Sequence, residues 1–265
     1  MNIAIRLETP ADYHAVEEIT REAFWSFWEP NTKICAEHLL VHRLRSVASF
    51  VPELDFVAEY DGKIVGHIIY TRSKIVSDDG SEYETLTFGP LTVAPECQSM
   101  GIGKMLMRHS FDEAKRLGYR AVLIFGHPDY YPRVGFRRAA EFGITPTVGN
   151  VRDPFMAYPL YGGALDGIHG RYFIDPVYEQ LAEADVFEFD KRFPLKEPFF
   201  PSSISILLDK LDALPRKALE DTGCVSLEMM TSISEREVTS LPGIDANSVE
   251  IIRSTLRSHG MRWGE

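Results

Sequence analysis

The chain has 265 residues, of which 45% are hydrophobic and 25% charged, and its formal net charge at pH 7 is −11. This composition is typical of a globular protein and excludes collagen-like, mucin-like and wholly disordered chains. The net negative charge argues against a general nucleic-acid-binding surface, because binding a polyanion needs clustered basic residues. No basic leader precedes a long apolar run and no stretch reaches the roughly 18 apolar residues of a membrane span, so we expect a cytoplasmic protein.

The first 75 residues predict two helices and a hairpin. Residues 10–27 and 36–46 have helical patterns, and the segment DFVAEYDGKIVGHIIYT follows them. Asp61 and Gly62 separate two apolar runs, and both residue types tolerate the positive φ of a tight hairpin turn. A third strand, YETLTFGPLTV, is expected after the turn at residues 78–80.

A strand, helix, strand unit is predicted over residues 86–125. Apolar residues recur at spacings of three and four from Gly103 to Leu117, which indicates an amphipathic helix that Gly118 ends. Residues 120–125 form an unbroken apolar run, typical of a strand buried on both faces. The unit predicts an α/β fold with a mixed sheet.

The remainder of the chain predicts short strands and then a helical module. Short strands or loops are expected in GITPTV, FMAYPLYGGAL and GIHGRYFI, and the Pro- and aromatic-rich KRFPLKEPFFPSS is the expected linker. We therefore predict one domain over residues 1–200 and a helical module over residues 201–265, with net charges of −8 and −3.

A candidate anion-binding turn lies between the third strand and the amphipathic helix. Unpaired amides at a helix N-terminus bind anions, and glycines let a phosphate approach the backbone closely. Lys104, in the first helical turn, opposes the helix dipole unless an anion compensates. The chain has no Gly-Lys-Ser/Thr of a P-loop, and Leu106 replaces the third glycine of a dinucleotide-binding motif. A plain structural turn is the alternative. The turn comprises Gln98, Ser99, Met100, Gly101, Ile102, Gly103 and Lys104.

Here the sequence resembles the GCN5-related N-acetyltransferase (GNAT) superfamily. Gln98, Gly101 and Gly103 match its Gln/Arg-x-x-Gly-x-Gly/Ala motif, and HPDYYPRVGF looks like its terminal Tyr-x-x-x-Gly-Phe. The segments REAF, EHLLVHRLR and FVAEYDGKIVGHI extend the resemblance over residues 1–200. The resemblance implies the GNAT acyl-CoA acyltransferase fold, with a mixed central sheet that is splayed, and acetyl-CoA (CoA) as the cofactor.

The resemblance also implies a site for that cofactor. Leu91, Thr92 and Val93 would contact the pantetheine arm through their backbone, while residues 98–104 would hold the pyrophosphate through main-chain amides. Gly89 and Pro90 are expected to interrupt the strand ladder, because Pro lacks a donor and Gly favours bulges. No metal is implied. The three cysteines are far apart and form no C-x-x-C pair, so they suggest neither a disulfide nor a zinc site.

The implied reaction is direct attack of a primary amine on the thioester, with no covalent acyl-enzyme. The Leu91 amide would stabilise the oxyanion, and Tyr131 matches the general acid that protonates the leaving thiolate. A tyrosine packed beside the cofactor, with no proton role, is the alternative. Thr87 stands where some family members carry a catalytic glutamate. Replacement bases could be Glu84, His127, Asp129 or a water chain.

Other residues admit both a structural and a functional interpretation. His67 is expected to be a packing histidine rather than part of an acceptor cleft, and Cys97 a side chain that covers the turn. Core packing is the default for a dense aromatic cluster near the N-terminus, and a wall of the acceptor pocket is its alternative role. That cluster comprises Phe24, Trp25, Phe27 and Trp28.

Residues 212–263 resemble the C-terminal domain of the bacterial RNA polymerase alpha subunit, a helix-hairpin-helix fold. The match lies in LEDTGCVSLEMM and LPGIDANSVEIIRSTLRSHGM. Residues 245–247 replace the glycine and lysines of such domains, and Leu214 replaces their minor-groove arginine, so nucleic acid is an improbable partner and a protein contact is favoured. Two functions remain open: an N-acetyltransferase for a small-molecule or protein amine, and an acyl-CoA-sensing regulator. No membrane partner is expected.

Overall fold

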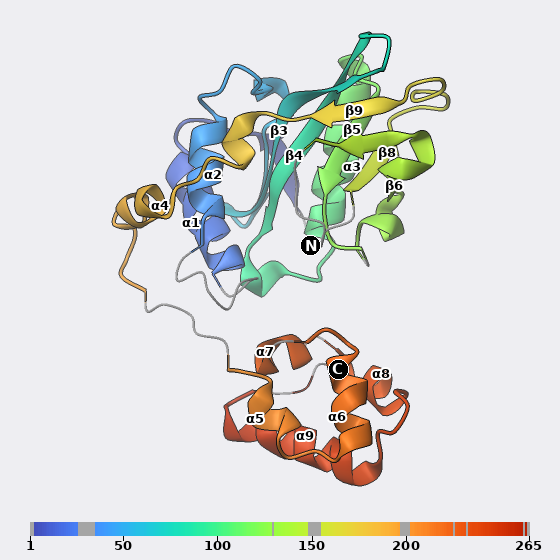
Figure 1. Cartoon of the computed structure of the whole chain (residues 1–265). Helices are drawn as coiled ribbons and strands as arrows, with labels where there is room; N and C mark the ends of the chain where they lie inside the picture. The colour runs from blue at the N-terminus through green and yellow to red at the C-terminus, as the bar shows by residue number, and fades with distance from the viewer. Residues whose placement is uncertain are drawn as a thin grey trace. The chain divides into compact units, whose positions relative to one another are not determined.

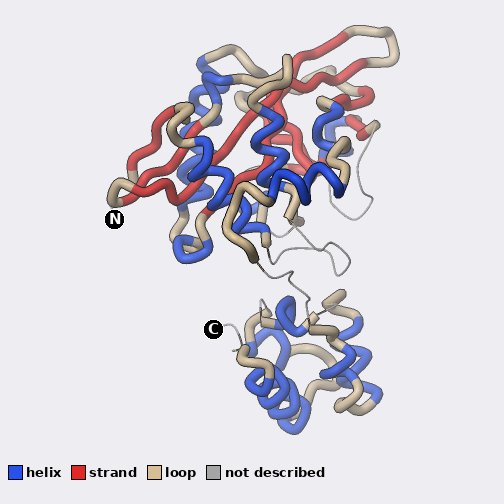
Figure 2. The backbone as a smooth tube through the Cα atoms, turned by 90° about the vertical axis from the view of Figure 1, so that its left-hand side faces the viewer, coloured by secondary structure: helices blue, strands red, loops and turns tan. Residues whose placement is uncertain are grey.

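The structure, a computed structural model, describes residues 3–25, 35–128, 130–147, 155–196, 202–224, 226–231, 233–261 and 263. Residue contacts divide the chain into two compact units, the first formed mainly by residues 1–197 and the second mainly by residues 198–265 (Figure 1). The first unit contains all of the described strands, and the second consists of helices and loops (Figure 2). Within the described residues, no helix has both the length and the apolar character needed to cross a membrane.

A mixed nine-stranded sheet forms the centre of the first unit. Its main path runs β1-β2-β3-β4-β5-β8-β6, and β9 pairs with both β3 and β7. The pairs β4–β5 and β7–β9 are parallel, and the other pairs are antiparallel. The expected mixed sheet is confirmed. The strands are β1 Ala4–Leu7, β2 Phe56–Tyr60, β3 Lys63–Val76, β4 Glu82–Val93, β5 Ala121–Phe125, β6 Arg137–Arg138, β7 Ile144–Pro146, β8 Phe155–Pro159 and β9 Gly170–Phe173.

Helices cover both faces of the sheet, as the alternation of side chains along β2 shows. Phe56 and Ala58 pack in the main core with helix α3, whereas Val57 between them packs with residues of α1 and α2 on the other face. The helices of this unit are α1 Tyr13–Phe24, α2 Glu37–Leu44, α3 Ile102–Arg116 and α4 Glu183–Asp190. Short 3₁₀ turns are η1 Pro52–Leu54, η2 Pro95–Cys97, η3 Tyr131–Val134, η4 Ala139–Phe142 and η5 Pro176–Tyr178.

Local sequence signals predicted several boundaries well. The β2–β3 hairpin turns at Asp61 and Gly62, whose φ angles are +49° and +73°, and Gly118 ends α3 with φ +91°. Helix α1 begins later than the pattern suggested, at Tyr13, because Asp12 accepts the Thr9 N–H and pairs with Arg6 ahead of the helix. Residues 26–27 of that predicted helix lie outside the described chain.

Strand β4 carries an irregularity at Gly89 and Pro90. Opposite β3, the register passes from Ile68↔Leu91 to Tyr70↔Phe88, so β4 has one more residue than its partner across this step. Gly89 has φ +155°, a conformation that side chains disfavour. The expected interruption of the ladder is confirmed.

The second unit has a small core of its own. Leu207, Leu219 and Ile252 are fully buried and pack with apolar residues from the other helices. Ser234 caps α8 and Asp245 caps α9, and the turn between these helices contains Gly243 with φ +86°. The helix-hairpin-helix interpretation stays a prediction. The helices are α5 Ser205–Leu208, α6 Ala213–Glu220, α7 Leu227–Met230, α8 Glu235–Thr239 and α9 Ala246–Ser258.

Candidate active site

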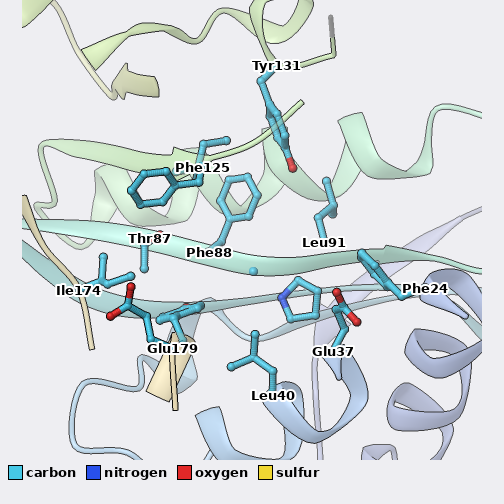
Figure 3. Close-up of a pocket in the computed structure, with 14 residues that line it drawn as sticks. Phe24, Glu37, Leu40, Thr87, Phe88, Leu91, Phe125, Tyr131, Ile174 and Glu179 are labelled. Atoms are coloured by element: carbon cyan, nitrogen blue, oxygen red, sulfur yellow. The ribbon is translucent and has the colours of Figure 1, made fainter. Parts of the chain in front are cut away.

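The parallel strands β4 and β5 frame a pocket of about 460 Å³ in the first unit. Their one register pair in the described residues is Leu86↔Val122, and both strands continue beyond that pair toward their carboxyl ends. Side chains from the far ends of both strands line the pocket (Figure 3). The lining residues are Phe24, Glu37, Leu40, Thr87, Phe88, Gly89, Pro90, Leu91, Ile124, Phe125, Tyr131, Ile174, Tyr178 and Glu179.

The turn after β4 presents backbone amides at the start of α3. Ser99 has φ +63° and Gly101 has φ +83°. The first hydrogen bond of the α3 ladder runs from the Met105 N–H to the Gly101 carbonyl at 3.0 Å. The backbone amides of residues 102–104 come before this bond, as the first amides of a helix do. The first turn of α3 has no acidic residue, and the Lys104 side chain is exposed. These amides and this cation suit an anion.

The end of β4 lies directly against this turn. Leu91 and Val93 pack in the same core as α3, and a Cβ placed on Gly103 would lie 3.6 Å and 3.7 Å from their side chains. Thr92 points the other way, where its Oγ1 lies 2.9 Å from Thr20 Oγ1 of α1. The Thr92 side chain is therefore occupied, and only its backbone can face a ligand. Gln98 Nε2 donates to the Val93 carbonyl at 3.3 Å and ties the turn to the strand.

Tyr131 begins η3 and lines the pocket, where Figure 3 shows its hydroxyl directed inward. Its ring centroid lies 6.0 Å from that of Phe88 and 5.4 Å from that of Phe136. Burial raises the pKa of Tyr131 well above its ordinary value, so the phenol keeps its proton across the neutral range.

Tyr130, which the sequence analysis did not single out, reaches the candidate anion-binding turn. A Cβ on Gly103 would lie 3.0 Å from the Tyr130 hydroxyl, so the glycine makes room for that side chain. No local pattern distinguishes Tyr130 from Tyr131 in the sequence. The chain path after β5 decides which tyrosine enters the pocket and which lies over α3.

The proposed replacements for a catalytic base on β4 do not gather at the pocket. Glu84 is exposed and lines a separate depression with Arg72 and Lys74. His127 is exposed and absent from the pocket lining, and Asp129 lies outside the described residues. Thr87 lines the pocket.

Two carboxylates that the sequence analysis missed do line the pocket. Glu37 is the first residue of α2, and Glu179 directly follows η5. Figure 3 shows both carboxylates on the side opposite Tyr131. A surface-like glutamate at a helix start carries no sequence signal for this position, because the packing of α2 on the sheet sets its direction.

The structure shows the positions of the residues for which the sequence allowed both a structural and a functional role. His67 is fully buried and its Nε2 lies 2.8 Å from Asp55 Oδ1, which confirms the packing histidine. Cys97 is buried in η2 beside the turn, as expected. Phe24 lines the pocket, whereas the Arg21 guanidinium lies over the Trp25 ring at 4.4 Å from its centroid. Residues 27 and 28 lie outside the described chain.

Sequence comparison finds a family that the first unit resembles. Residues 17–138 match the sequence model of the acetyltransferase (GNAT) family. They include β4, the turn, α3, β5 and the Tyr131 segment. The matched residues lie mainly in the first unit, which is therefore similar to this family.

Two relatives from Escherichia coli carry the name uncharacterized N-acetyltransferase. YjhQ of strain K12 is 39% identical over 101 residues, which cover 38% of this chain and 55% of that protein. The chain thus spans about half the length of YjhQ. YhbS of strain K12 is 28% identical over 167 residues, which cover 63% of this chain and 92% of that protein.

Solved structures agree with the fold. E. coli YhbS, described as a GNAT family N-acetyltransferase in complex with CoA, superposes with a TM-score of 0.60 at 24% identity. The match covers 69% of this chain and 94% of YhbS. A GNAT family acetyltransferase from Brucella melitensis, in complex with acetyl-CoA, gives a TM-score of 0.52 at 26% identity. It covers 67% of this chain and 99% of the other.

Proposed function

We propose that the first unit is an acetyl-CoA-dependent N-acetyltransferase that transfers an acetyl group directly to a primary amine. The observation that carries this proposal is that three features lie together in the first unit. The carboxyl ends of β4 and β5 frame a pocket, the amides at the start of α3 adjoin the end of β4, and Tyr131 lines the same pocket. The relative from B. melitensis, which was solved with acetyl-CoA, supports the same ligand for this chain.

The backbone of the turn and of β4 suits acetyl-CoA. Residues 98–104 would bind the pyrophosphate, because the early amides of α3 precede its hydrogen-bond ladder and Lys104 adds a positive charge. The pantetheine arm would be held by the main-chain groups of Leu91, Thr92 and Val93. The Thr92 side chain cannot take part, because it is hydrogen-bonded to Thr20. When bound, the cofactor supplies an acetyl thioester, which is open to attack by a neutral amine.

Two groups of the chain would assist the transfer. The Leu91 amide, beside the Gly89–Pro90 irregularity, would stabilise the oxyanion, as preorganised backbone donors do in acyl transfer. Tyr131 Oη would donate a proton to the departing sulfur, and the thiol that forms has an ordinary pKa of about 8.5. The raised pKa of Tyr131 makes it a weak acid in general but keeps the proton in place until the thiolate forms.

The acceptor is a small-molecule or protein amine, and the C-terminal unit is proposed to contact another protein. The alternative of an acyl-CoA sensor without catalysis has no observation in its favour, because Tyr131 and two carboxylates line the pocket.

Titration calorimetry and thiol release test the function together. We expect the chain to bind CoA and acetyl-CoA, with no comparable heat from ATP or NAD, and to release CoA thiol when supplied with an accepted amine. Binding of ATP or NAD in place of CoA would refute the assignment of the turn. Normal CoA binding without acetyl transfer to any amine would favour the sensor.

A further inference from the structure

The pocket wall opposite Tyr131 carries negative charge and no positive charge. Glu37 reaches it from α2 and Glu179 from the end of η5, and no Lys or Arg is among the described residues that line it. Neither carboxylate forms an ion pair with another described residue. The proposed function does not specify the chemical class of the acceptor amine. Glu37 and Glu179 can select that class, because both carboxylates line the pocket.

The Glu37 carboxylate is held in place but not neutralised. Its Oε2 accepts the Ala36 N–H at 3.1 Å and the Cys35 thiol at 3.2 Å. Its position at the start of α2 favours the ionised form, because the helix dipole is positive there. Burial acts in the other direction and raises the pKa of Glu37. A half-buried carboxylate with these partners is stabilised by a cationic ligand in the pocket.

The rest of the wall is apolar. Aromatic and aliphatic side chains surround the carboxylates, so the body of the ligand must also be apolar to replace the water there. Two carboxylates in one pocket repel a ligand that carries a third. These apolar residues include Phe24, Leu40, Phe125 and Ile174.

We propose that the acceptor is a primary amine on an apolar body with no carboxylate beside the amine. Glu37 binds its ammonium group and removes one proton, and Glu179 excludes anionic acceptors. This inference rests on the proposed function. The ammonium gives one proton to Glu37, the neutral nitrogen forms the C–N bond, and the C–S bond breaks. Tyr131 protonates the sulfur, and the second proton lost by nitrogen replaces the Tyr131 proton.

A matched pair of ligands tests the class of acceptor. Phenethylamine and phenylalanine differ only by the carboxylate beside the amine. With the full chain and acetyl-CoA, we expect kcat/KM for phenethylamine to exceed that for phenylalanine at least tenfold, and Glu179→Gln to narrow the difference. Calorimetry with the CoA-loaded chain should show the same order of affinity. Equal use of both ligands, a preference for phenylalanine, or no binding of phenethylamine would overturn the inference.

Glu37→Gln tests the role of the carboxylate. We expect kcat/KM for phenethylamine to fall about 10²-fold, within the usual effect of losing a general base, while the CoA Kd and the unfolding midpoint change little. Glu18→Gln, an equal change at an exposed site on α1, is the control and should leave kcat/KM unchanged. Glu37→Asp should restore part of the activity. Unchanged kcat/KM in Glu37→Gln would overturn the role of Glu37.

The pH profile separates proton transfer from a structural effect. Glu37 must be ionised to accept a proton, so activity should fall as pH drops through its raised pKa, and Glu37→Gln should lack that acidic limb. The titratable groups near Glu37 in the described residues are Cys35, Glu179, Tyr131 and Tyr178. An acidic limb that persists in Glu37→Gln would contradict the inference. Failure of the wild-type chain to bind CoA would instead refute the proposed function.

Discussion

The ring of Tyr131 lies against Gly126 so closely that a Cβ at position 126 would come within 2.3 Å of its Cε2 atom. The glycine follows β5 directly, and the tyrosine begins η3 five residues later. The chain therefore folds back on itself after β5, and only a residue without a side chain permits Tyr131 its place in the pocket.

Gly126→Ala should displace Tyr131 and lower turnover. A misplacement of about 1 Å at a reacting group can cost about 10²-fold in rate, so we expect a loss of that order in kcat, with CoA affinity nearly unchanged. Steady-state thiol release and calorimetry measure the two effects. Gly162→Ala is the control, because a Cβ there meets no atom within 4 Å. Equal kcat in both variants would show that the contact does not position Tyr131.

Tyr131→Phe should reduce turnover and preserve CoA binding, because the substitution removes a proton donor and keeps the ring that packs on Phe88. We expect kcat to fall by on the order of 10²-fold. Since burial raises the pKa of Tyr131, the wild-type rate should show no loss from its ionisation up to about pH 10, the ordinary value for tyrosine. A rate in Tyr131→Phe equal to that of the wild type would assign the proton to water.

Gly101→Val should weaken CoA binding more than it weakens folding. Gly101 has φ +83°, and its added side chain would project into space free of described atoms, where the pyrophosphate is proposed to lie. Gly118→Val is a matched control, because Gly118 has φ +91° at the other end of α3. Both variants should lose about 1–2 kcal/mol of stability from the left-handed conformation, but only Gly101→Val should raise the CoA Kd. Similar Kd values in the two would make the turn purely structural.

His67→Gln should change how stability depends on pH. Burial lowers the pKa of His67 from its ordinary 6.5 to about 4. The folded chain therefore takes up the imidazole proton at a lower pH than the unfolded chain. The stability from neutral His67 is complete above about pH 6.5 and is lost as pH falls toward 4. The wild-type advantage over His67→Gln should therefore shrink by about 3 kcal/mol between pH 7 and pH 4.

Urea unfolding at several pH values measures this difference. Burial also raises the pKa of Asp55 to about 6 and that of Glu8 to about 7, and these groups stabilise the fold as pH falls. Arg45 contacts Glu8 at 2.7 Å and opposes the latter shift. Both proteins contain these three groups, so the comparison reports the loss of His67 together with its effect on the adjacent Asp55 and Glu8. A difference in unfolding free energy that stays constant with pH would contradict the assignment.

The C-terminal unit should fold independently and bind duplex DNA no better than a generic acidic protein. Its buried core supplies the stability, and its net charge of −3 leaves little counterion release to drive binding. Arg253 pairs with Glu235 and Glu250, and Lys217 lies 3.6 Å from Asp221. A fragment of residues 201–265 should show helical circular dichroism and no salt-dependent shift of duplex DNA. Submicromolar, salt-sensitive binding would favour a DNA-tethered acetyltransferase.

Local patterns in the sequence predicted much of the fold around the site. The Asp61–Gly62 turn, the amphipathic period of α3 and the apolar run of β5 each depend on residues close together in the chain, so their structures follow from local conformational preference and burial. The same holds for the irregularity at Gly89, where an absent side chain and a following proline interrupt the ladder.

The sequence by itself determined the mixed sheet and pointed to the candidate anion-binding turn and the family resemblance, because short contiguous motifs carry all three. Only the tertiary structure decided which acids face Tyr131. It removed Glu84 from the pocket and brought in Glu37 and Glu179 from segments distant in the chain. The direction of a helix face depends on how that helix packs against the sheet, and residue spacing within the helix does not specify that contact.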